Sequence, residues 1–437
     1  MKIGIVGLGF VGLSLTSVLA SKGYEVIGID IDKEKQIKIS NGISPFFEPE
    51  LENLLKKGLK KKLVISSDFS VIRNCDFIFV TVGTPQNTDG SINLSIIKKA
   101  VSIIGENLQE SKKKPIILVK STVIPRTMQK TILPILEKKS NKKAGKDFGL
   151  ISNPEFLQES TAIRDTKFPH VIVLGGYETE FMKKTKKLFT ELHPNIPIII
   201  TNHQTAEMIK YANNSFLATK ISFINQLSNI CQKIPGANID DIAKTIGLDP
   251  RIGALFLNAG PGYGGSCLPK DMKALINFAS TTGVTPTLLN AVENVNIKQL
   301  EQIISIIKQR LGNLTSKRIT ILGTAFKPNT DDIRDSIAIE LIKKLQKRKV
   351  NVTIHDPKAI KNTKKIFGNK INYAKTVGDA LSKSQCVVIM TQWKQYKKLN
   401  NNQFKKMKKK FVIDCRRMLT SKQLDVDYFA IGLGKEN

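Results

Sequence analysis

Short apolar runs alternate with longer amphipathic stretches along residues 1–202. The short runs are rich in β-branched residues, which favour strands, and the longer stretches place apolar residues at helical spacing. Strands that alternate with helices in this way predict a parallel sheet wrapped by helices. The expected strands are residues 2–6, 25–29, 77–81, 116–120, 150–152, 171–174 and 198–201.

The pattern changes near His203. Residues 204–233 hold apolar side chains at helical spacing without a strong helix breaker, which predicts one long helix or two nearly continuous ones. Further helical stretches continue to residue 311, and a glycine-rich loop interrupts them. The middle of the chain is therefore expected to be α-helical.

Strand and helix patterns alternate again from Lys317. The expected strands are RITILG, NVTIHD, QCVVIMT, KFVIDC and YFAIGL, and residues 337–348 are the clearest expected helix. This alternation predicts a second α/β domain. We place the three domains at residues 1–202, 203–311 and 312–437.

Net charge is the most unusual property of the composition. The 437 residues carry a formal charge of +31, which 58 lysines and only 10 arginines supply. Proteins that read nucleic acids typically gather arginines and aromatic residues on one face, whereas these lysines are spread through helices and turns. We therefore interpret the excess as solvated surface lysine and expect no nucleic-acid partner.

The cysteines and histidines indicate neither a metal site nor a disulfide framework. Five cysteines are widely spaced, C-x-x-C is absent, and four histidines show no ligand spacing. Such cysteines fit a reducing cytoplasm. No apolar run of the sequence approaches the roughly 18 residues that a membrane span needs. We expect a cytoplasmic protein without a metal and without a membrane partner.

A glycine fingerprint follows the first expected strand. Gly7, Gly9 and Gly12 form G-x-G-x-x-G between a strand and a helix, where glycines allow a tight turn, close approach of a pyrophosphate and close helix–sheet packing. Asp30 ends the second expected strand, where a carboxylate hydrogen-bonds the ribose 2′-hydroxyl and disfavours a 2′-phosphate. The chain is therefore expected to begin with a Rossmann domain that binds NAD rather than NADP.

Polar residues follow three other expected strands of this domain. Thr84, Thr122 and Glu155 each stand close behind the carboxyl end of a strand, where open α/β sheets bind ligands. Each of these segments is also an ordinary turn former, but three such ends in one nucleotide-binding domain favour a site. If residues 155–163 are helical, Glu155 and Glu159 share a face and could activate a water.

Two polar residues interrupt the apolar pattern of the expected long helix. Lys210 and Asn214 are four residues apart, so they face the same way. A lysine and an amide on a mostly apolar helix could stabilise an oxyanion, or they could form a solvated stripe. The spacing alone does not separate these two interpretations.

The densest glycine cluster of the chain is GPGYGGSCLPKD, residues 260–271. Cys267 stands there among small and polar residues, whereas structural cysteines usually stand in apolar runs, as Cys386 does. Lys270 would favour its thiolate, and the glycines let backbone approach a ligand. A dehydrogenase with a loop cysteine suggests an aldehyde-level oxidation, in which a thiolate traps a carbonyl, a hydride leaves and a thioester forms.

Taken in order, the motifs of the chain resemble those of the UDP-glucose 6-dehydrogenase family, within the wider group of nucleotide-sugar dehydrogenases. The motifs are GLGFVG, EVIGIDID, GTP, KSTVIP, SNPEFLQESTA, AEMIKYANNSF, DPRIG, FLNAGPGYGGSCLPKD and LGTAFKPNTDDIRDS. The resemblance covers nearly the full length. It implies oxidation of a sugar C6 alcohol to a carboxylate with two NAD⁺, in UDP-glucuronate and polysaccharide biosynthesis. It also implies an α/β fold with an N-terminal Rossmann domain, a central α-helical dimerisation region and a second, Rossmann-like C-terminal domain that binds UDP.

The resemblance also implies roles for individual residues. The implied catalytic residues are Cys267 as the nucleophile, Lys210, Asn214 and Asp271 around the oxyanion, and Thr122, Glu155 and Glu159 for acid–base chemistry and water. The implied cofactor contacts are Gly7, Gly9, Phe10, Val11, Gly12, Asp30, Lys35, Thr84, Thr122, Glu159, Lys270 and Arg334. The implied substrate contacts are Glu155, Phe156, Leu157, Glu159, Lys210, Asn214, Arg251, Phe256, Leu257, Asn258, Ala259, Gly260, Gly264 and Lys327. Of these, Arg251 is implied to reach the site of the partner subunit, which requires a homodimer or a higher homo-oligomer.

Several activities stay open beside UDP-glucose oxidation. Ser266 stands where relatives that act on N-acetylated sugars tend to have histidine, which disfavours a UDP-N-acetylhexosamine 6-dehydrogenase. NPEFLQESTA and GGSCLPKD also resemble GDP-mannose 6-dehydrogenases, whereas DPRIG with FLNAGPGYGG favours UDP-glucose. A basic nucleic-acid-binding protein on a Rossmann scaffold is the distant alternative, because it would not need the aligned catalytic residues.

Overall fold

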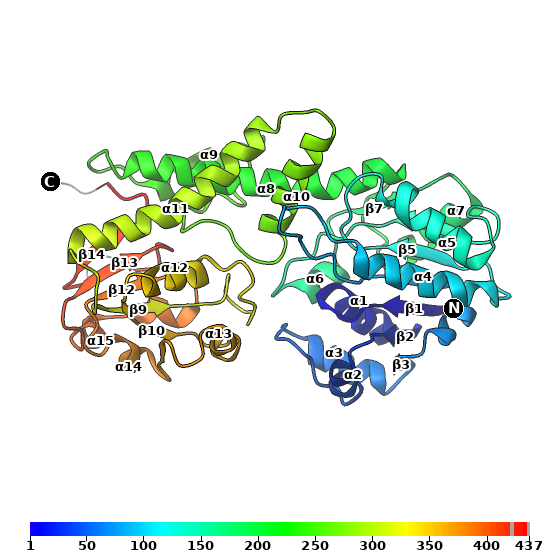
Figure 1. Cartoon of the computed structure of the whole chain (residues 1–437), viewed down its shortest axis with the longest axis horizontal. Helices are drawn as coiled ribbons and strands as arrows, with labels where there is room; N and C mark the ends of the chain where they lie inside the picture. Colours follow the sequence, from blue (N-terminus) through cyan, green and yellow to red (C-terminus); the bar gives the residue numbers. More distant parts are fainter. Residues whose placement is uncertain (420–423, 435–437) are drawn as a thin grey trace. The chain divides into compact units, whose positions relative to one another are not determined.

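A computed structural model describes residues 1–419 and 424–434 of the chain (Figure 1). The chain divides into two compact units, Met1–Asn213 and Asn214–Asn437. Among the described residues, no helix combines the length and the apolar composition that crossing a membrane requires.

The first unit is built on an eight-stranded sheet in the order β3-β2-β1-β4-β5-β6-β7-β8 (Figure 1). Its strands are β1 Lys2–Val6, β2 Glu25–Ile29, β3 Leu63–Ser66, β4 Phe77–Val80, β5 Ile116–Val119, β6 Gly149–Ser152, β7 Ile172–Gly175 and β8 Ile198–Thr201. Its helices are α1 Phe10–Ser21, α2 Lys33–Ser40, α3 Leu51–Leu59, α4 Ser95–Gln109, α5 Leu133–Ser140, α6 Ala162–Lys167 and α7 Glu180–Leu192, with short helices η1 Phe69–Asn74 and η2 Met128–Ile132. The expected strands are confirmed to within one residue at each end, and the short, half-exposed β3 is an addition.

The expectation of a wholly parallel sheet is wrong at one strand pair. β6 and β7 pair antiparallel, through Ser152 and Gly175, and β8 then runs parallel to β7. Every residue of β6 and β7 is buried. A strand that is buried on both faces has the same apolar pattern in either direction, so the pattern could not give its direction.

Alternate side chains of the strands enter two separate cores. Ile5 of β1 and Phe79 of β4 belong to the core that also contains side chains of α1. Val6 and Val80, the next residues along these strands, belong to the core that also contains side chains of α4. Successive strand residues point to opposite faces of a sheet, so helices cover both faces, as a Rossmann domain requires.

The long helix expected over residues 204–233 is confirmed as one continuous helix, α8 His203–Cys231, and the boundary between the two units falls within it. The second unit continues with α9 Ile239–Gly247, α10 Leu268–Thr281 and α11 Thr287–Leu311. These helices confirm the expected helical middle region. Ile224 of α8 and Ile303 of α11 share one buried core with the sheet that follows.

That second sheet has six parallel strands in the order β11-β10-β9-β12-β13-β14 (Figure 1). The strands are β9 Arg318–Leu322, β10 Asn351–His355, β11 Asn372–Tyr373, β12 Cys386–Ile389, β13 Phe411–Asp414 and β14 Asp427–Ala430. The helices are α12 Ile337–Gln346, α13 Ile360–Phe367, α14 Val377–Leu381 and α15 Asn401–Phe404, with the short helix η3 Lys394–Lys398. The expected second α/β domain is thus confirmed.

Candidate active site

The glycine fingerprint forms the tight turn between β1 and α1, where the start of the helix packs closely against the end of the strand. A Cβ atom on Gly12 would lie 1.8 Å from the Gly7 oxygen and 2.6 Å from Thr81 Oγ1, so only glycine allows this packing. At Gly9, which precedes α1, an added Cβ would meet no atom within 4 Å. The N-terminus of α1 therefore presents open backbone, which fits a dinucleotide pyrophosphate.

Asp30 follows β2, and donors from three directions hold its carboxylate. Leu8 N lies 2.8 Å from Oδ2, Asp32 N lies 3.0 Å from Oδ1, and Lys35 Nζ lies 2.9 Å from Oδ2. Burial by itself would raise the pKa of Asp30, but the hydrogen bonds from Lys35, Asp32 and Leu8 together outweigh burial and lower it. A charged, fixed carboxylate accepts from ribose hydroxyls and repels a 2′-phosphate, so these residues fit NAD.

The predicted strand-end residues of β4 and β5 lie together. The Thr84 hydroxyl donates to the Thr122 carbonyl at 2.7 Å, which joins the two strand ends. At the start of α1, the Phe10 ring stacks on Phe46 with centroids 3.9 Å apart, and Val11 lies beside it in the first turn. Thr84, Thr122 and Phe10 each follow the carboxyl end of a strand, and this is the edge where open α/β sheets bind ligands.

Lys210 and Glu155 form a buried ion pair in the first unit. Lys210 Nζ lies 3.2 Å from Glu155 Oε1, and the two side chains are 4% and 8% exposed. Lys210 Nζ also lies 5.5 Å from the centre of the Phe156 ring. Burial rules out the interpretation of Lys210 as part of a solvated stripe. An ammonium group in so dry a setting interacts strongly with any negative oxygen that reaches it.

Residues 155–163 do not form one helix, so the condition for Glu155 and Glu159 to share a helix face is not met. α6 begins only at Ala162, the Glu155 carboxylate accepts from Leu157 N at 2.5 Å, and Ser160 has φ +69°. A residue at positive φ cannot continue an α-helix. Glu155 and Glu159 therefore do not share a helix face, and Glu159 lies in the turn before α6.

Lys120 is a charged residue that sequence reasoning missed. It follows β5, and its Nζ donates to Asn153 Oδ1 at 3.0 Å. Burial lowers the pKa of Lys120 to about 8, although the charge of Glu155 opposes that change. Lys120 immediately precedes Ser121 and Thr122, so the strand-end rule could have found it. Its ammonium group can release a proton near physiological pH.

Cys267 is the residue immediately before α10 and is half-buried, whereas the other four cysteines are buried. The N-terminus of a helix stabilises negative charge, so the position of Cys267 favours a thiolate. Burial raises the pKa of Cys75 to about 11 and the pKa of Cys386 well above its usual value. Cys267 is thus the cysteine best placed to react.

The predicted partners of Cys267 in the second unit are brought together. Asn214 Nδ2 donates to Asp271 Oδ2 at 2.6 Å, and Lys270 Nζ lies 2.5 Å from Asp271 Oδ1. Asp271 N donates to the Cys267 carbonyl at 2.8 Å, so the buried carboxylate lies in the first turn of the helix that Cys267 begins. Two donors orient the Asp271 carboxylate, which in turn fixes the amide of Asn214.

Buried amides of α8 and α11 clamp the glycine loop. Asn225 Oδ1 accepts from Gly260 N at 2.8 Å, and Gln299 Nε2 donates to the Gly260 carbonyl at 3.0 Å. Asn296 accepts from Tyr263 N at 2.7 Å and donates to the Tyr263 carbonyl at 3.1 Å. The loop before Cys267 is therefore held by helices on both sides, although its composition suggests flexibility.

A cavity of about 210 Å³ opens onto this loop in the second unit. Four predicted substrate residues line it: Phe256, Asn258, Gly260 and Gly264. The predicted Leu257 and Ala259 are instead 3% and 5% exposed and pack in the core behind it. The amide and backbone groups of the lining suit a polar ligand.

Sequence reasoning missed Phe326, Gln392 and Arg416, which also line this cavity. Each follows a strand of the second sheet, β9, β12 and β13 respectively. Because ligands bind at the carboxyl ends of strands in an open α/β sheet, their positions after these strands are the sequence signal for all three. Arg416 Nε donates to the Met390 carbonyl at 2.8 Å, and burial lowers the pKa of Arg416 to about 10, far above neutrality.

The predicted Lys327, Arg334 and Arg251 also lie outside the cavity lining. Lys327 Nζ lies 5.8 Å from the centre of the adjacent Phe326 ring. Arg334 makes a two-point contact with Asp332, with Nε 2.8 Å and Nη2 2.5 Å from Oδ2. Arg251 pairs with Asp249 at 2.6 Å and is 87% exposed. Within residues 1–419 and 424–434, no group of His, Cys, Asp and Glu could hold a metal ion.

The Rossmann fingerprint and the charged ribose acceptor of the first unit are those of an NAD-dependent dehydrogenase. The chain matches the UDP-glucose/GDP-mannose dehydrogenase family over three successive parts. These are its NAD binding domain (residues 1–193), its central domain (residues 204–298) and its UDP binding domain (residues 320–421). The protein belongs to this family, and NAD is its cofactor.

Individual relatives are similar to this chain over nearly its full length. The chain is 38% identical to a UDP-glucose 6-dehydrogenase of Haloferax volcanii, over 98% of this chain and 99% of the relative. It is 37% identical to a UDP-glucose 6-dehydrogenase of Bacillus subtilis, over 99% of this chain and 93% of the relative. Its fold is similar to that of a UDP-glucose dehydrogenase from the hyperthermophilic archaeon Pyrobaculum islandicum, with TM-score 0.92, 30% identity, and coverage of 99% of this chain and 98% of that one.

Proposed function

We propose that the protein oxidises C6 of UDP-glucose twice, to give UDP-glucuronate. One observation carries the proposal: the half-exposed Cys267 immediately precedes α10, and Asp271 in the first turn of that helix accepts a hydrogen bond from Asn214 of α8. A single-step alcohol dehydrogenase has no need of such a thiol. One alcohol, one water and two NAD⁺ give one carboxylate, two NADH and three protons.

Cys267 would keep the intermediate on the protein between the two oxidations. After C6 has lost a hydride and its hydroxyl proton, the thiolate attacks the aldehyde carbon and the oxygen takes a proton, which forms a thiohemiacetal. Loss of that proton and a second hydride leaves a thioester. Water then attacks the thioester carbon, the C–S bond breaks, and the thiolate leaves with release of the carboxylate and two protons. Bound NAD⁺ supplies the hydride acceptor in both rounds.

The polar residues around the thiol would manage charge and protons. Lys210 and Asn214 donate to the oxygen that becomes negative during attack on C6. Asp271 holds the amide of Asn214 in the orientation that donation requires. Glu155, beside Lys210, would accept protons, and Thr122 and Glu159 would position the hydrolytic water.

The cavity beside the glycine loop would seat the nucleotide sugar. Phe256, Asn258, Gly260 and Gly264 supply apolar and backbone contacts, and Arg416 supplies a cation for the diphosphate. Lys327 would add a second cation. Glu155, Phe156 and Leu157 complete the substrate contacts, and Lys35, Lys270 and Arg334 complete the cofactor contacts of this proposal.

The decisive measurement is the stoichiometry of NADH. Purified protein with limiting UDP-glucose is expected to form about two NADH per sugar, as a covalently retained aldehyde requires. Cys267→Ser should abolish formation of the acid, whereas Cys231→Ser, which changes a buried cysteine of α8, should leave two NADH per sugar. An unimpaired Cys267→Ser variant would contradict the mechanism. Turnover of GDP-mannose or a UDP-N-acetylhexosamine, without turnover of UDP-glucose, would show that the substrate is that other nucleotide sugar.

We further propose a cytoplasmic homodimer with the domains 1–202, 203–311 and 312–437. Five free cysteines support a reducing compartment. Phe216, Phe223 and Ile230 of α8 are 65%, 51% and 49% exposed, and their seven-residue spacing places them on one face of the helix. An apolar stripe of this kind fits a self-complementary interface. The exposed Arg251 would then reach the partner's site.

A further inference from the structure

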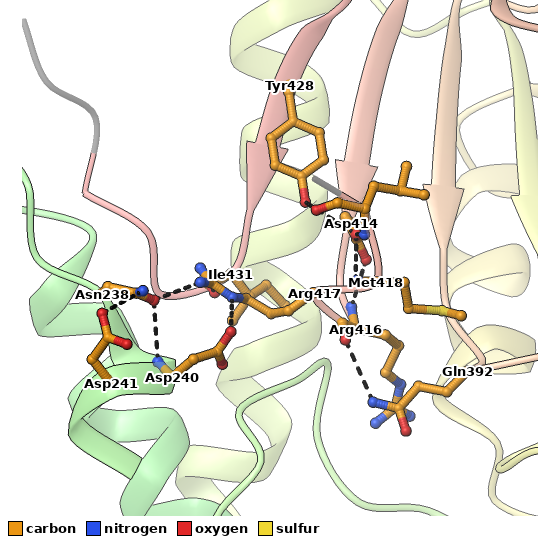
Figure 2. Close-up of polar contacts among 11 residues, drawn as sticks. Asn238, Asp240, Asp241, Gln392, Asp414, Arg416, Arg417, Met418, Tyr428 and Ile431 are labelled. Carbon is orange, nitrogen blue, oxygen red and sulfur yellow. Dashed lines mark hydrogen bonds and ion pairs between the residues drawn. The ribbon is translucent and has the colours of Figure 1, made fainter. Parts of the chain in front are cut away.

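The turn after β13 is built around one buried carboxylate. Asp414 accepts from Arg416 N at 3.0 Å, Met418 N at 2.7 Å and Leu419 N at 2.8 Å, and from the Tyr428 hydroxyl at 3.0 Å (Figure 2). Four donors on one carboxylate fix the backbone of the turn. The turn carries two successive arginines, Arg416 and Arg417, whose side chains leave it on different sides (Figure 2).

Arg416 is the arginine that lines the cavity. Its Nε donates to the Met390 carbonyl at 2.8 Å, and its own carbonyl accepts from Gln392 Nε2 at 3.4 Å. A Cβ added to Gly260 would lie 3.0 Å from Arg416 Nη1, so the guanidinium lies directly against the glycine loop. Arg416 therefore depends on a precise path of the turn to stay in the cavity wall.

Arg417 points to the other side of the turn from Arg416, and its three guanidinium nitrogens all donate to protein groups (Figure 2). Nε donates to Asp240 Oδ2 at 2.8 Å, Nη2 to Asn238 Oδ1 at 2.5 Å, and Nη1 to the Ile431 carbonyl at 3.3 Å. Its side chain is 12% exposed. Arg417 has φ +53°, a conformation that a side chain disfavours and that surrounding contacts must hold.

Two partners of Arg417, Asn238 and Asp240, lie at the N-terminus of α9, where several further hydrogen bonds hold the backbone. Asn238 caps α9 by accepting from Asp240 N at 3.2 Å, and it also donates to Asp241 at 2.7 Å. The segment after β14 pairs with the same region, because Ile239 N donates to the Gly432 carbonyl and Gly434 N to the Ala237 carbonyl, both at 2.9 Å. Arg417 thus connects the turn to the start of α9, which Gly432 and Gly434 also contact.

We propose that Arg417 is a positioning residue for substrate binding: its clamp on Asn238, Asp240 and the Ile431 carbonyl holds the β13 turn so that Arg416 faces the nucleotide sugar. The inference rests on the proposed function, because it takes the cavity as the seat of the UDP group. Arg417 itself touches neither substrate nor cofactor. Its effect should therefore disappear once Arg416 is gone.

A double-mutant cycle on the full chain tests this inference, with UDP as the probe and titration calorimetry as the assay. Arg416→Ala and Arg417→Ala should each raise the Kd for UDP about tenfold or more. The Kd of the double variant should be within about twofold of that of Arg416→Ala alone. Arg417→Lys should restore part of the affinity, because lysine can keep one ion pair with Asp240. Arg310→Ala, which removes an arginine 3.7 Å from Asp427 in the same unit, is the matched control and should leave the Kd unchanged.

Steady-state kinetics then separate a loss of substrate positioning from a general loss of structure. Arg417→Ala should raise KM for UDP-glucose about tenfold, while KM for NAD⁺ and kcat at saturating substrate stay within about threefold. An Arg417→Ala variant that binds UDP like the wild type would overturn the inference, and so would additive losses in the double variant or an equal rise in KM for NAD⁺. A wild-type protein that does not bind UDP would overturn the proposed function first, and the inference with it.

Discussion

Cofactor choice can be tested by removing the charge of Asp30. In the wild type the carboxylate is held at 2.8 Å from Leu8 N and 2.9 Å from Lys35 Nζ, and its lowered pKa keeps it ionised at neutral pH. Two unit charges about 4 Å apart in a partly solvated site repel by about 4 kcal/mol. Asp30→Ser removes that repulsion toward a 2′-phosphate and releases Lys35 to pair with it.

The expected change in specificity follows from these contacts. A free energy of about 4 kcal/mol corresponds to about a thousandfold, and the neighbouring Lys35 cation offsets part of it. The ratio of kcat/KM for NAD⁺ to that for NADP⁺ should therefore fall by about 30- to 1,000-fold in Asp30→Ser. Part of the fall should come from weaker NAD⁺ binding, since the variant also loses the acceptor for the ribose hydroxyls.

The assay is steady-state formation of NADH or NADPH at saturating UDP-glucose. Asp32→Ser is the matched control, because Asp32 lies on the same loop and only caps α2 by accepting from Lys35 N. That control should leave the cofactor ratio within about threefold of wild type. An Asp30→Ser variant whose ratio also stays within threefold would refute the carboxylate as the source of selectivity.

Three further predictions concern the fingerprint, the proposed dimer and pH. Gly9→Ala should fold normally, because an added Cβ meets no protein atom there, but calorimetry should show NAD⁺ binding at least tenfold weaker. Gly12→Ala should lower the free energy of unfolding by about 3 kcal/mol or more in denaturant, because its Cβ would lie 1.8 Å from the Gly7 oxygen. Equal stabilities of the two variants would contradict these roles of the two glycines. Phe223→Glu should convert the dimer to monomer in light scattering at micromolar concentration, and Phe168→Glu, at a 72% exposed position of the first unit, should not. Burial and the nearby Lys22 cation lower the pKa of His193 to about 4, so its contribution to stability is complete above about pH 6.5 and is lost as pH falls toward 4. His193→Gln should reduce the acid-induced loss of unfolding free energy by about 2 kcal/mol, after allowance for partial exposure. An unchanged slope of unfolding free energy against pH would contradict this role of His193.

The strand positions of both sheets could be predicted from the sequence because buried parallel strands are short apolar runs between glycine and polar turns. β1, β2 and β8 match their expected limits at both ends. The missed strand, β3, is half-exposed and has a mixed pattern, so local periodicity did not separate it from a loop. The direction of β7 was also missed, because direction is a property of pairing and not of composition.

Residues 155–161 are not helical, for a local physical reason that residue spacing does not show. Leu157 N donates to the Glu155 carboxylate, and Ser160 takes positive φ, so backbone groups are satisfied without a helical ladder. Lys210 shows the complementary case. Its four-residue spacing from Asn214 was visible in the sequence, but only its burial beside Glu155 removed the solvated interpretation.

The class of fold and the cofactor could be inferred from local sequence features, because glycine turns and polar residues at strand ends are short motifs that recur wherever NAD is bound. Which side chains meet depends on the three-dimensional fold. Arg416 comes from the end of β13 and Gly260 from a loop more than a hundred residues earlier, yet they lie against each other in one cavity wall. Contacts between distant segments of this unit are set by how its sheet and its helices pack, and packing depends on the shapes of many residues together.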